Sequence, residues 1–271
     1  MQSWVTLIIQ GGKILIDNKV ALITGSGRGI GKGIAITLAR AGYDIAINYN
    51  SSREGAEKVA QEVAKFNRKV NIYKANIQHI EEIKTMFQNL YNDFGRLDLL
   101  VNNAGVTRMN PVLEVTEEMW NEVMNTDLRG TFFCSQAAFK IMKEKEIKGT
   151  IINITSNHAL GCWPDSSVYA AAKAGVEKLT KNLALDLSEY GIRVCSIAPG
   201  YTELHWEDKY KHGKYIIPTA KKIPLQRFGT PEEIGEAVVF LASESAGYIT
   251  GASLFIDGGA TLPIVADNRF V

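Results

Sequence analysis

The chain is 271 residues long, 46% of its residues are hydrophobic, and its formal net charge at pH 7 is +1. This length and apolar content fit one large α/β domain, and the charge gives no reason to expect a nucleic acid or an anionic membrane as partner. The three cysteines, Cys134, Cys162 and Cys195, lie far apart and form no CxxC motif. We therefore expect reduced thiols, a cytoplasmic location and no metal site.

Residues 1–17 are expected to form an N-terminal extension ahead of a single domain at 18–271. The extension contains a short apolar run, Trp4–Ile9, that no basic residue precedes, so a signal peptide is not predicted. No apolar run in the chain approaches the ~18 residues of a membrane-spanning helix.

Beyond residue 18, short apolar runs alternate with amphipathic stretches. The expected strands are Val20–Thr24, Ile45–Asn48, Val70–Tyr73, Leu97–Asn102, Thr150–Thr155, Arg193–Ala198 and Ser253–Ile256. The expected helices cover 30–41, 53–66, 79–93, 117–143, 166–190 and 231–243. Near-continuous apolar strands separated by helices indicate a parallel sheet covered on both faces. The pattern predicts an α/β fold with a doubly wound, Rossmann-like sheet of seven parallel strands.

The first expected strand runs into a glycine-rich turn, Thr24-Gly25-Ser26-Gly27-Arg28-Gly29-Ile30-Gly31, which opens the first expected helix. Gly25 permits the tight turn, Gly29 lets backbone amides approach a pyrophosphate, and Gly31 allows close packing of helix and strand. The free N–H groups and the positive dipole end of the helix favour phosphate at this point. Glycines placed between a first strand and a helix therefore predict a dinucleotide-binding site.

Tyr169 and Lys173 lie four residues apart in the expected helix 166–190, so their side chains share one face. A free tyrosine has a pKa near ~10 and is a poor proton shuttle at neutral pH. A nearby cation favours the phenolate, and lowering the pKa of a phenol by two to three units takes roughly 3–4 kcal/mol of differential stabilisation. Alone, such a pair is more often a half-buried ring beside a solvated ammonium. Beside a dinucleotide site it indicates proton transfer.

The glycine turn and the Tyr169–Lys173 pair resemble those of the short-chain dehydrogenase/reductase family, and further matches extend over nearly the whole chain. They are Asn102-Asn103-Ala104-Gly105 after the fourth strand, Ser156 thirteen residues before Tyr169, Pro199-Gly200 after the sixth strand and Asp257-Gly258-Gly259 after the last. The resemblance implies hydride transfer between the nicotinamide C4 of a dinucleotide cofactor and a carbonyl or secondary alcohol.

The resemblance also assigns catalytic roles. Tyr169 would donate or accept the proton of the reacting oxygen, Ser156 would hydrogen-bond that oxygen, and Lys173 would act on Tyr169 and hold the nicotinamide ribose. The fourth catalytic position departs from the family, whose members typically have Asn-Leu-x-Gly where this chain has Asp127-Leu128-Arg129-Gly130. Asp127 keeps the acceptor oxygens of that asparagine, loses its amide donor and adds a negative charge near Lys173. We expect the variant Asp127→Asn to keep or raise activity.

The residue at the end of the second expected strand bears on the choice between NAD and NADP. NAD-specific relatives have an aspartate there that binds the adenosine ribose. Here Tyr49 aligns with that position and no acid occurs before Glu54. Arg28 and Arg53 could face a 2′-phosphate, although Arg53 could also be a solvated residue at the start of a helix. We therefore expect NADP to be preferred, with NAD possible. The expected cofactor contacts are Gly25, Ser26, Arg28, Gly29, Ile30, Gly31, Tyr49, Asn50, Ser51, Asn76, Ile77, Asn103, Ala104, Gly105, Tyr169, Lys173, Pro199, Gly200 and Thr202.

Two segments bear on the substrate. His158 and Trp163 resemble residues of glucose 1-dehydrogenases at matching offsets, and a flat aromatic wall with polar groups suits a sugar or polyol. Both side chains could equally pack the loop or a subunit contact. Residues 200–228 form a long connection that we expect to be a substrate lid, with Glu203 as a further substrate contact.

These observations predict an NAD(P)-dependent oxidoreductase that acts on a sugar or polyol, and the family resemblance implies a homotetramer. A carbonyl reductase similar to β-ketoacyl carrier-protein reductases is the nearest alternative, because fold and cofactor motifs do not separate substrates. From another class, the chain could be a non-catalytic dinucleotide sensor. Ser156, Tyr169 and Lys173 argue against a sensor, and Asp127 is the only feature in its favour.

Overall fold

The computed structural model describes residues 8–10, 13–15, 19–203 and 219–262. Its centre is a parallel sheet in the order β5-β4-β3-β6-β7-β8-β9. The strands are β3 (Val20–Ile23), β4 (Asp44–Tyr49), β5 (Val70–Lys74), β6 (Leu99–Asn102), β7 (Thr150–Ile154), β8 (Arg193–Pro199) and β9 (Ser253–Ile256). Each strand lies where the sequence pattern places one, so the predicted fold class is confirmed.

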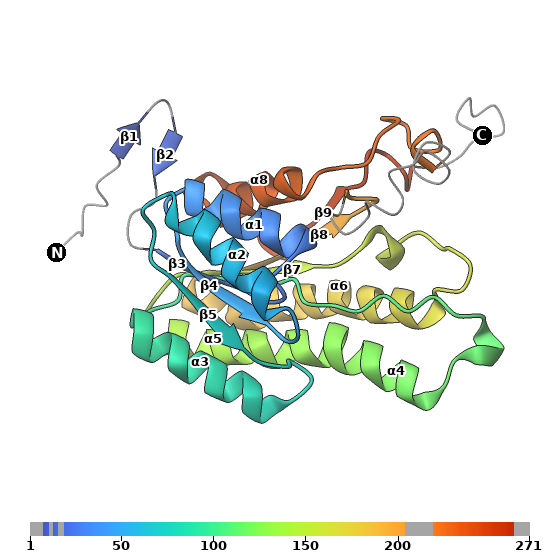
Figure 1. Ribbon diagram of the computed structural model, residues 1–271, viewed down its shortest axis with the longest axis horizontal. Coiled ribbons are helices and arrows are strands. Elements are labelled where there is room, and N and C mark those ends of the chain that lie inside the picture. The colour runs from blue at the N-terminus through green and yellow to red at the C-terminus, as the bar shows by residue number, and fades with distance from the viewer. Residues whose placement is uncertain (1–7, 11–12, 16–18, 204–218, 263–271) are drawn as a thin grey trace.

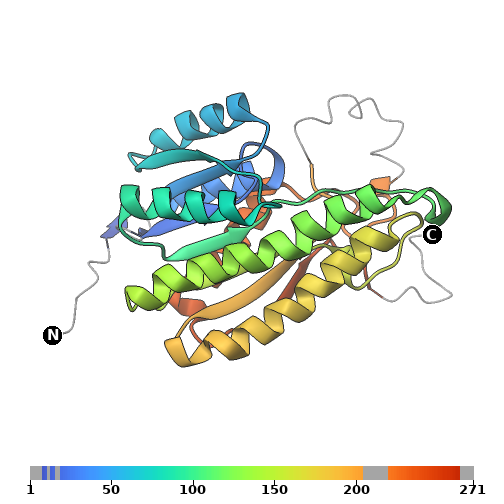
Figure 2. The same cartoon turned by 90° about the horizontal axis from the view of Figure 1, so that it is seen from below.

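Helices cover both faces of this sheet (Figure 1). One face carries α1 (Gly29–Arg40), α2 (Arg53–Ala64) and α8 (Pro231–Ala242); the other carries α3 (Ile80–Phe94), α5 (Thr131–Glu144) and α6 (Ser167–Leu187). Figure 2 shows α5 and α6 side by side across the second face. A hydrophobic core lies on each face of the sheet, and alternate residues of a strand point into the two cores. In β3, Ala21 and Ile23 pack on the first face, and Val20 and Leu22 pack on the second.

The strand order reverses between β3 and β6. The chain leaves β3 for β4 on one side, whereas β6, the next strand after β5, pairs with β3 on the other side. At such a switch point the connections diverge above the carboxyl ends of the two strands and leave a crevice that binds ligands. The site described below lies in this crevice.

The expected helix 117–143 is interrupted. It consists of α4 (Glu117–Val123), the π-helix η2 (Met124–Gly130) and α5. A π-helical turn holds an additional residue and is often found at functional sites. Gly130 ends the turn against Ile77, because a Cβ there would lie 2.8 Å from the Ile77 Cδ1 atom. The turn places Asp127 inside the protein, with 1% of its surface exposed.

The remaining elements are short. They are the 3-10 helices η1 (Val112–Glu114), η3 (Asn157–Ala159), η4 (Ser188–Tyr190) and η6 (Glu244–Ala246), together with the antiparallel pair β1 (Ile8–Gln10) and β2 (Lys13–Leu15). The β1–β2 pair lies in the expected extension 1–17 and forms a sheet of its own. Among the described residues, no helix combines the length and the hydrophobicity needed to cross a membrane.

Candidate active site

The glycine turn between β3 and α1 adopts a backbone that requires glycine. Gly25 and Gly29 have φ angles of +64° and +55°, in the left-handed region. A Cβ on Gly31 would lie 2.5 Å from the Asn103 side chain and 2.7 Å from the Gly25 carbonyl oxygen. The N-cap residue of α1, Arg28, makes no capping hydrogen bond with its side chain, and the first turn of the helix contains no acid. Its free N–H groups can therefore bind phosphate oxygens.

Three polar side chains fix the turn to the sheet. The Thr24 hydroxyl oxygen accepts hydrogen bonds from the backbone N–H groups of Asn103 and Ala104, at 2.9 and 3.0 Å. The Asn103 amide donates to the Thr24 carbonyl at 2.9 Å. Asn48 accepts from the Gly25 N–H at 3.1 Å and donates to the carbonyl of Ala75. The sequence interpretation missed Asn48, although a polar residue in an otherwise apolar strand was the available signal.

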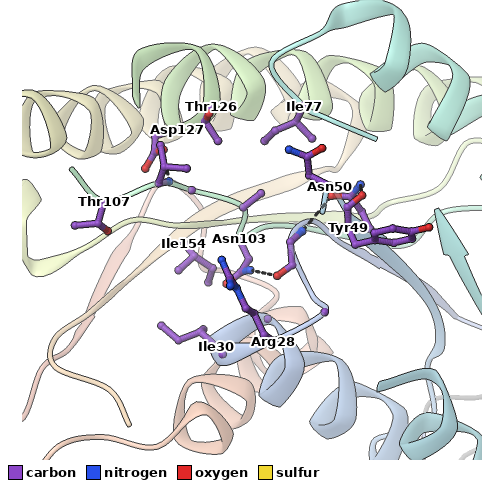
Figure 3. Close-up of a pocket in the computed structure, with 18 of the residues that line it drawn as sticks. Arg28, Ile30, Tyr49, Asn50, Ile77, Asn103, Thr107, Thr126, Asp127 and Ile154 are labelled. Atoms are coloured by element: carbon purple, nitrogen blue, oxygen red, sulfur yellow. Dashed lines mark hydrogen bonds between the residues drawn. The ribbon is translucent and has the colours of Figure 1, made fainter. Parts of the chain in front are cut away.

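These elements enclose a cleft of about 390 Å³ at the switch point. In Figure 3, Arg28 and Ile30 lie on the side of the glycine turn, Tyr49 and Asn50 lie at one end, and Asp127 lies at the opposite end. The predicted residues that line the cleft are Gly25, Arg28, Gly29, Ile30, Gly31, Tyr49, Asn50, Ser51, Asn76, Ile77, Asn103, Ala104, Gly105, Asp127, Tyr169 and Lys173. Ser52, which the sequence indicated as a possible donor to a 2′-phosphate, also lines the cleft. Lining residues that the sequence interpretation missed are Gly27, Asn48, Ala75, Gln78, Val106, Thr107, Glu122, Thr126, Ile154 and Thr155.

Lys173 and Asp127 form a buried ion pair at one end of the cleft. The Lys173 Nζ atom lies 3.0 Å from Asp127 Oδ2 and donates to the Ile154 carbonyl at 3.2 Å. Asp127 Oδ1 accepts from the Val106 N–H at 2.8 Å. Burial alone lowers the pKa of Lys173, but the charges of Asp127 and Tyr169 outweigh it, so the pKa is raised and the ammonium stays charged. The Nζ atom lies 5.6 Å from the centre of the Tyr169 ring.

His158 connects Ser156 to Tyr169. Its Nδ1 atom lies 3.2 Å from the Ser156 Oγ atom, and its ring meets the Tyr169 ring edge-on, with 5.3 Å between the ring centres. On the other side it stacks on Trp163, with ring centres 4.2 Å apart. Burial lowers the pKa of His158, which favours the neutral imidazole near pH 7. Ser156 also caps η3 by accepting from the His158 N–H.

Among the described residues that line the cleft, the only acids are Glu122 and Asp127. Asp127 lies at the end opposite to Tyr49 and Asn50 (Figure 3), and the lining segment 49–52 contains no carboxylate. Arg53 does not line the cleft. Its guanidinium pairs with Glu57 at 2.8 Å on the exposed side of α2, which favours the solvated alternative for this residue.

Several predicted cofactor and substrate contacts lie outside this lining. The Ser26 hydroxyl donates to the Ile23 carbonyl, so it braces the turn from inside. Thr202 is buried, its hydroxyl donates to the Gly200 carbonyl, and its backbone forms a bridge with Gly229. Pro199 ends β8, and Ser156, His158, Trp163 and Glu203 also lie outside the lining. Most of the expected lid, 204–218, lies outside the described residues.

A dinucleotide-type crevice with an adjacent Ser-Tyr-Lys constellation defines a nicotinamide-dependent oxidoreductase. A family model described as enoyl-(acyl carrier protein) reductase matches residues 25–261. The 3-oxoacyl-[acyl-carrier-protein] reductase FabG of Staphylococcus aureus is 40% identical over 241 residues, which cover 89% of this chain and 97% of that protein. Acetoin dehydrogenase YohF from Salmonella typhimurium superposes with a TM-score of 0.85 at 35% identity, covering 92% of this chain and 98% of the other. A putative short-chain alcohol dehydrogenase from Sinorhizobium meliloti gives a TM-score of 0.87 at 34% identity, covering 92% and 99%.

The chain belongs to the short-chain dehydrogenase/reductase family. It is therefore an NAD(P)-dependent oxidoreductase of carbonyls and alcohols, and the predicted family and enzyme class are confirmed.

Proposed function

We propose that the substrate is a sugar or polyol, and that Ser156, Tyr169, Lys173 and Asp127 form the reacting centre. The glycine turn and the uncapped start of α1 fit a dinucleotide, since any side chain on Gly31 would clash with the turn. When bound, the nicotinamide supplies or accepts the hydride. Tyr169 exchanges a proton with the reacting oxygen, Ser156 donates a hydrogen bond to it, and Lys173 orients the ribose.

The His158–Trp163 stack carries the proposal for the substrate. It presents an aromatic surface beside Ser156, and flat aromatic faces pack well against sugar rings. Two buried nitrogens on this side, Nδ2 of Asn157 and Nε2 of His158, have no hydrogen-bond partner among the described residues. Buried polar atoms are rarely left unpaired, so hydroxyl groups of a ligand or ordered waters would satisfy them.

A preference for NADP is proposed from the opposite end of the cleft. Arg28 is exposed and lines the same cleft as Ser51 and Ser52, and among the described residues that line the cleft the acids are Glu122 and Asp127 alone. A charge-assisted hydrogen bond to phosphate contributes roughly 1.5–3 kcal/mol. We expect Arg28→Ala to lower kcat/KM for NADPH about tenfold or more and to leave kcat/KM for NADH nearly unchanged. Equal losses with both cofactors would contradict a role for Arg28 at the 2′-phosphate.

Reduction of a β-ketoacyl thioester is the second candidate. The 40% identity to the Staphylococcus aureus reductase over nearly the full length of both chains supports it. The two candidates differ in how they would contact the His158–Trp163 stack. The hydroxyl groups of a sugar can pair with the unpartnered nitrogens of Asn157 and His158, whereas a flexible acyl chain offers no such group. We expect His158→Ala to raise the KM of a sugar substrate at least tenfold, whereas a small effect would favour the thioester.

The experiment that tests the substrate class is a panel of sugars, polyols, small hydroxyketones and β-ketoacyl thioesters, each measured with NADPH or NADP and with NADH or NAD. The readout is the absorbance of the reduced nicotinamide. Turnover of a sugar or polyol with the highest kcat/KM is the expected result. A kcat/KM for the thioester that exceeds all the others would replace the proposal with the second candidate.

The proposal also covers the oligomeric state, the cellular location and the substrate lid. Large apolar side chains are exposed on two separate faces, Phe132 and Leu185 on α5 and α6, and Phe240 and Leu254 on α8 and β9. Two such faces support a homotetramer. The cysteines are free thiols, which is consistent with the cytoplasm. A lid at 200–228 would start from a fixed base, because the Glu203 N–H donates to the Gly229 carbonyl at 2.8 Å.

A further inference from the structure

The carboxylate of Asp127 is sealed inside the protein at the point where the family pattern has a neutral amide. Asp127 is 1% exposed and Lys173 is 4% exposed. One carboxylate oxygen accepts from the Val106 N–H, and the other lies 3.0 Å from the Lys173 ammonium. The Thr131 hydroxyl donates to the Asp127 carbonyl, which holds the π-helical turn in place. The carboxylate therefore has little freedom to leave the ammonium.

Gly105 packs closely against the pair at the end of the cleft that all three residues line. A Cβ on Gly105 would lie 2.9 Å from Asp127 Oδ2 and 3.3 Å from Lys173 Nζ. The backbone of the loop after β6 therefore lies directly over both charged groups. Because Asp127 and Lys173 are almost fully buried, the two charges act on each other and on Tyr169 with less screening than charges on the surface.

The other charged and titratable groups near Lys173 and Asp127 have partners of their own or, in the case of His158, a pKa that favours the neutral form. His158, from η3, has its pKa lowered by burial. Glu122, from α4, forms an ion pair with Arg108 at 2.8 Å. Glu177, one turn beyond Lys173 on α6, accepts from the hydroxyl groups of Thr155, Ser196 and Ser253. Among the described residues, Asp127 is thus the only ion-pair partner of Lys173.

The consequence for Tyr169 follows from the distances. The Lys173 ammonium lies 5.6 Å from the centre of the Tyr169 ring, so on its own it would strongly favour the phenolate. The carboxylate oxygen adds an opposite charge 3.0 Å from that ammonium, hence within about 8.6 Å of the ring centre. At this range a unit charge at an effective dielectric constant near ~20 changes a titration by about one pH unit.

We propose that Asp127 is a positioning residue that neutralises Lys173, so that Tyr169 faces a neutral ion pair instead of an isolated cation and ionises at a higher pH than it would beside asparagine. The inference rests on the proposed roles of Tyr169 and Lys173. It assigns to Asp127 the control of the pH range in which the enzyme works, beyond its place in the reacting centre. Oxidation of an alcohol, which needs the phenolate, would accordingly be favoured at alkaline pH.

The test compares the parent enzyme with Asp127→Asn, which keeps the shape of the side chain and removes its charge. We expect the acidic limb of kcat/KM for alcohol oxidation to move to lower pH by about one unit. A second readout needs neither cofactor nor turnover. The tyrosinate absorbance of each protein is titrated against pH, and the titration of its Tyr169→Phe derivative is subtracted. The difference isolates Tyr169, and its midpoint should move by the same amount as the kinetic limb.

Two controls separate charge from shape. Asp127→Glu retains the negative charge, so its tyrosinate midpoint should remain close to that of the parent even where its rate falls. Glu117→Gln removes the same charge from an exposed position at the start of α4, and solvent screens that position. Its midpoint should be unchanged.

The outcomes distinguish this inference from the function on which it rests. Unchanged midpoints in folded Asp127→Asn, as judged by its thermal unfolding, would overturn the role of Asp127 while leaving the proposed function intact. If Tyr169→Phe retained full turnover, the proposed function itself would fail. A midpoint that moved equally in Asp127→Asn and Asp127→Glu would show that packing, and not charge, controls Tyr169.

Discussion

Replacement of Gly31 by alanine tests the dinucleotide site most directly. The added Cβ would lie 2.5 Å from the Asn103 side-chain nitrogen, 2.7 Å from the Gly25 carbonyl oxygen and 2.8 Å from the Ser26 Cα atom. Two of these atoms belong to the turn backbone, which cannot yield without moving the phosphate-binding N–H groups. Asn103 would also have to give up its hydrogen bonds to the carbonyls of Thr24 and Gly25.

The expected change in the free energy of unfolding of Gly31→Ala combines three effects. Overpacking of this kind costs about 1–3 kcal/mol. Loss of the Asn103 hydrogen bonds adds about 1 kcal/mol each. The better helix propensity of alanine returns about 1 kcal/mol. We expect Gly31→Ala to raise the dissociation constant of the cofactor at least tenfold, which corresponds to about 1.4 kcal/mol. Cofactor fluorescence titration gives the dissociation constant, and thermal unfolding without cofactor gives the stability.

Gly33 in the same helix is the matched control. A Cβ on Gly33 would lie 2.4 Å from the Pro231 side chain, on the face of α1 that packs against α8, and Gly33 does not line the cleft. Gly33→Ala should therefore lower the unfolding temperature by several degrees and leave the dissociation constant of the cofactor unchanged. Equal weakening of cofactor binding by both substitutions would refute the argument that Gly31 acts at the turn.

Two further predictions concern the reacting centre and the fold. Tyr169→Phe should lower kcat about 10²–10⁴-fold, as the loss of a general acid does, while the cofactor dissociation constant, measured by fluorescence, stays within about twofold. Glu233 is held in a capping box and by Arg227, and these hydrogen bonds lower its pKa to about 2. The stability from this carboxylate is present above its ordinary pKa of 4.5 and is lost as the pH falls toward about 2. The unfolding temperature of Glu233→Gln should consequently fall less steeply than that of the parent over this range, and parallel curves would contradict the assignment.

The features of the glycine turn and the sheet that can be predicted from the sequence are those encoded by local backbone requirements. Gly25 and Gly29 are needed because the turn takes left-handed φ angles, and that need is visible in the sequence itself. The apolar strands are equally visible, because a strand buried on both faces tolerates few polar residues. The pairing of Tyr169 with Lys173 also follows from helical spacing alone.

What the sequence did not predict depends on contacts between distant segments. The π-helical turn leaves the amphipathic pattern of 117–143 nearly unchanged, and it is set by the packing of Gly130 against Ile77. Arg53 could pair with Glu57 or point into the cleft, and the sequence does not decide between the two. In the structure it pairs with Glu57, one helical turn away. Ser26 is an expected cofactor contact, but in the tight turn its hydroxyl donates to the Ile23 carbonyl.

The position of β3 between β4 and β6 has a consequence for folding. All neighbouring strands of the seven-stranded sheet are parallel, and the β3–β6 pair joins residues about 78 positions apart. Just beyond these two strands, the Asn103 N–H donates a hydrogen bond to the Thr24 hydroxyl oxygen. Parallel pairings over such separations form slowly, because a long loop must close before any contact is made. The cleft draws its lining from segments between Gly25 and Lys173, so no fragment ending before α6 contains it. Cofactor binding therefore reports the pairing of β3 with β6 and the docking of α6, and ligand added during refolding would stabilise only chains that have reached that state.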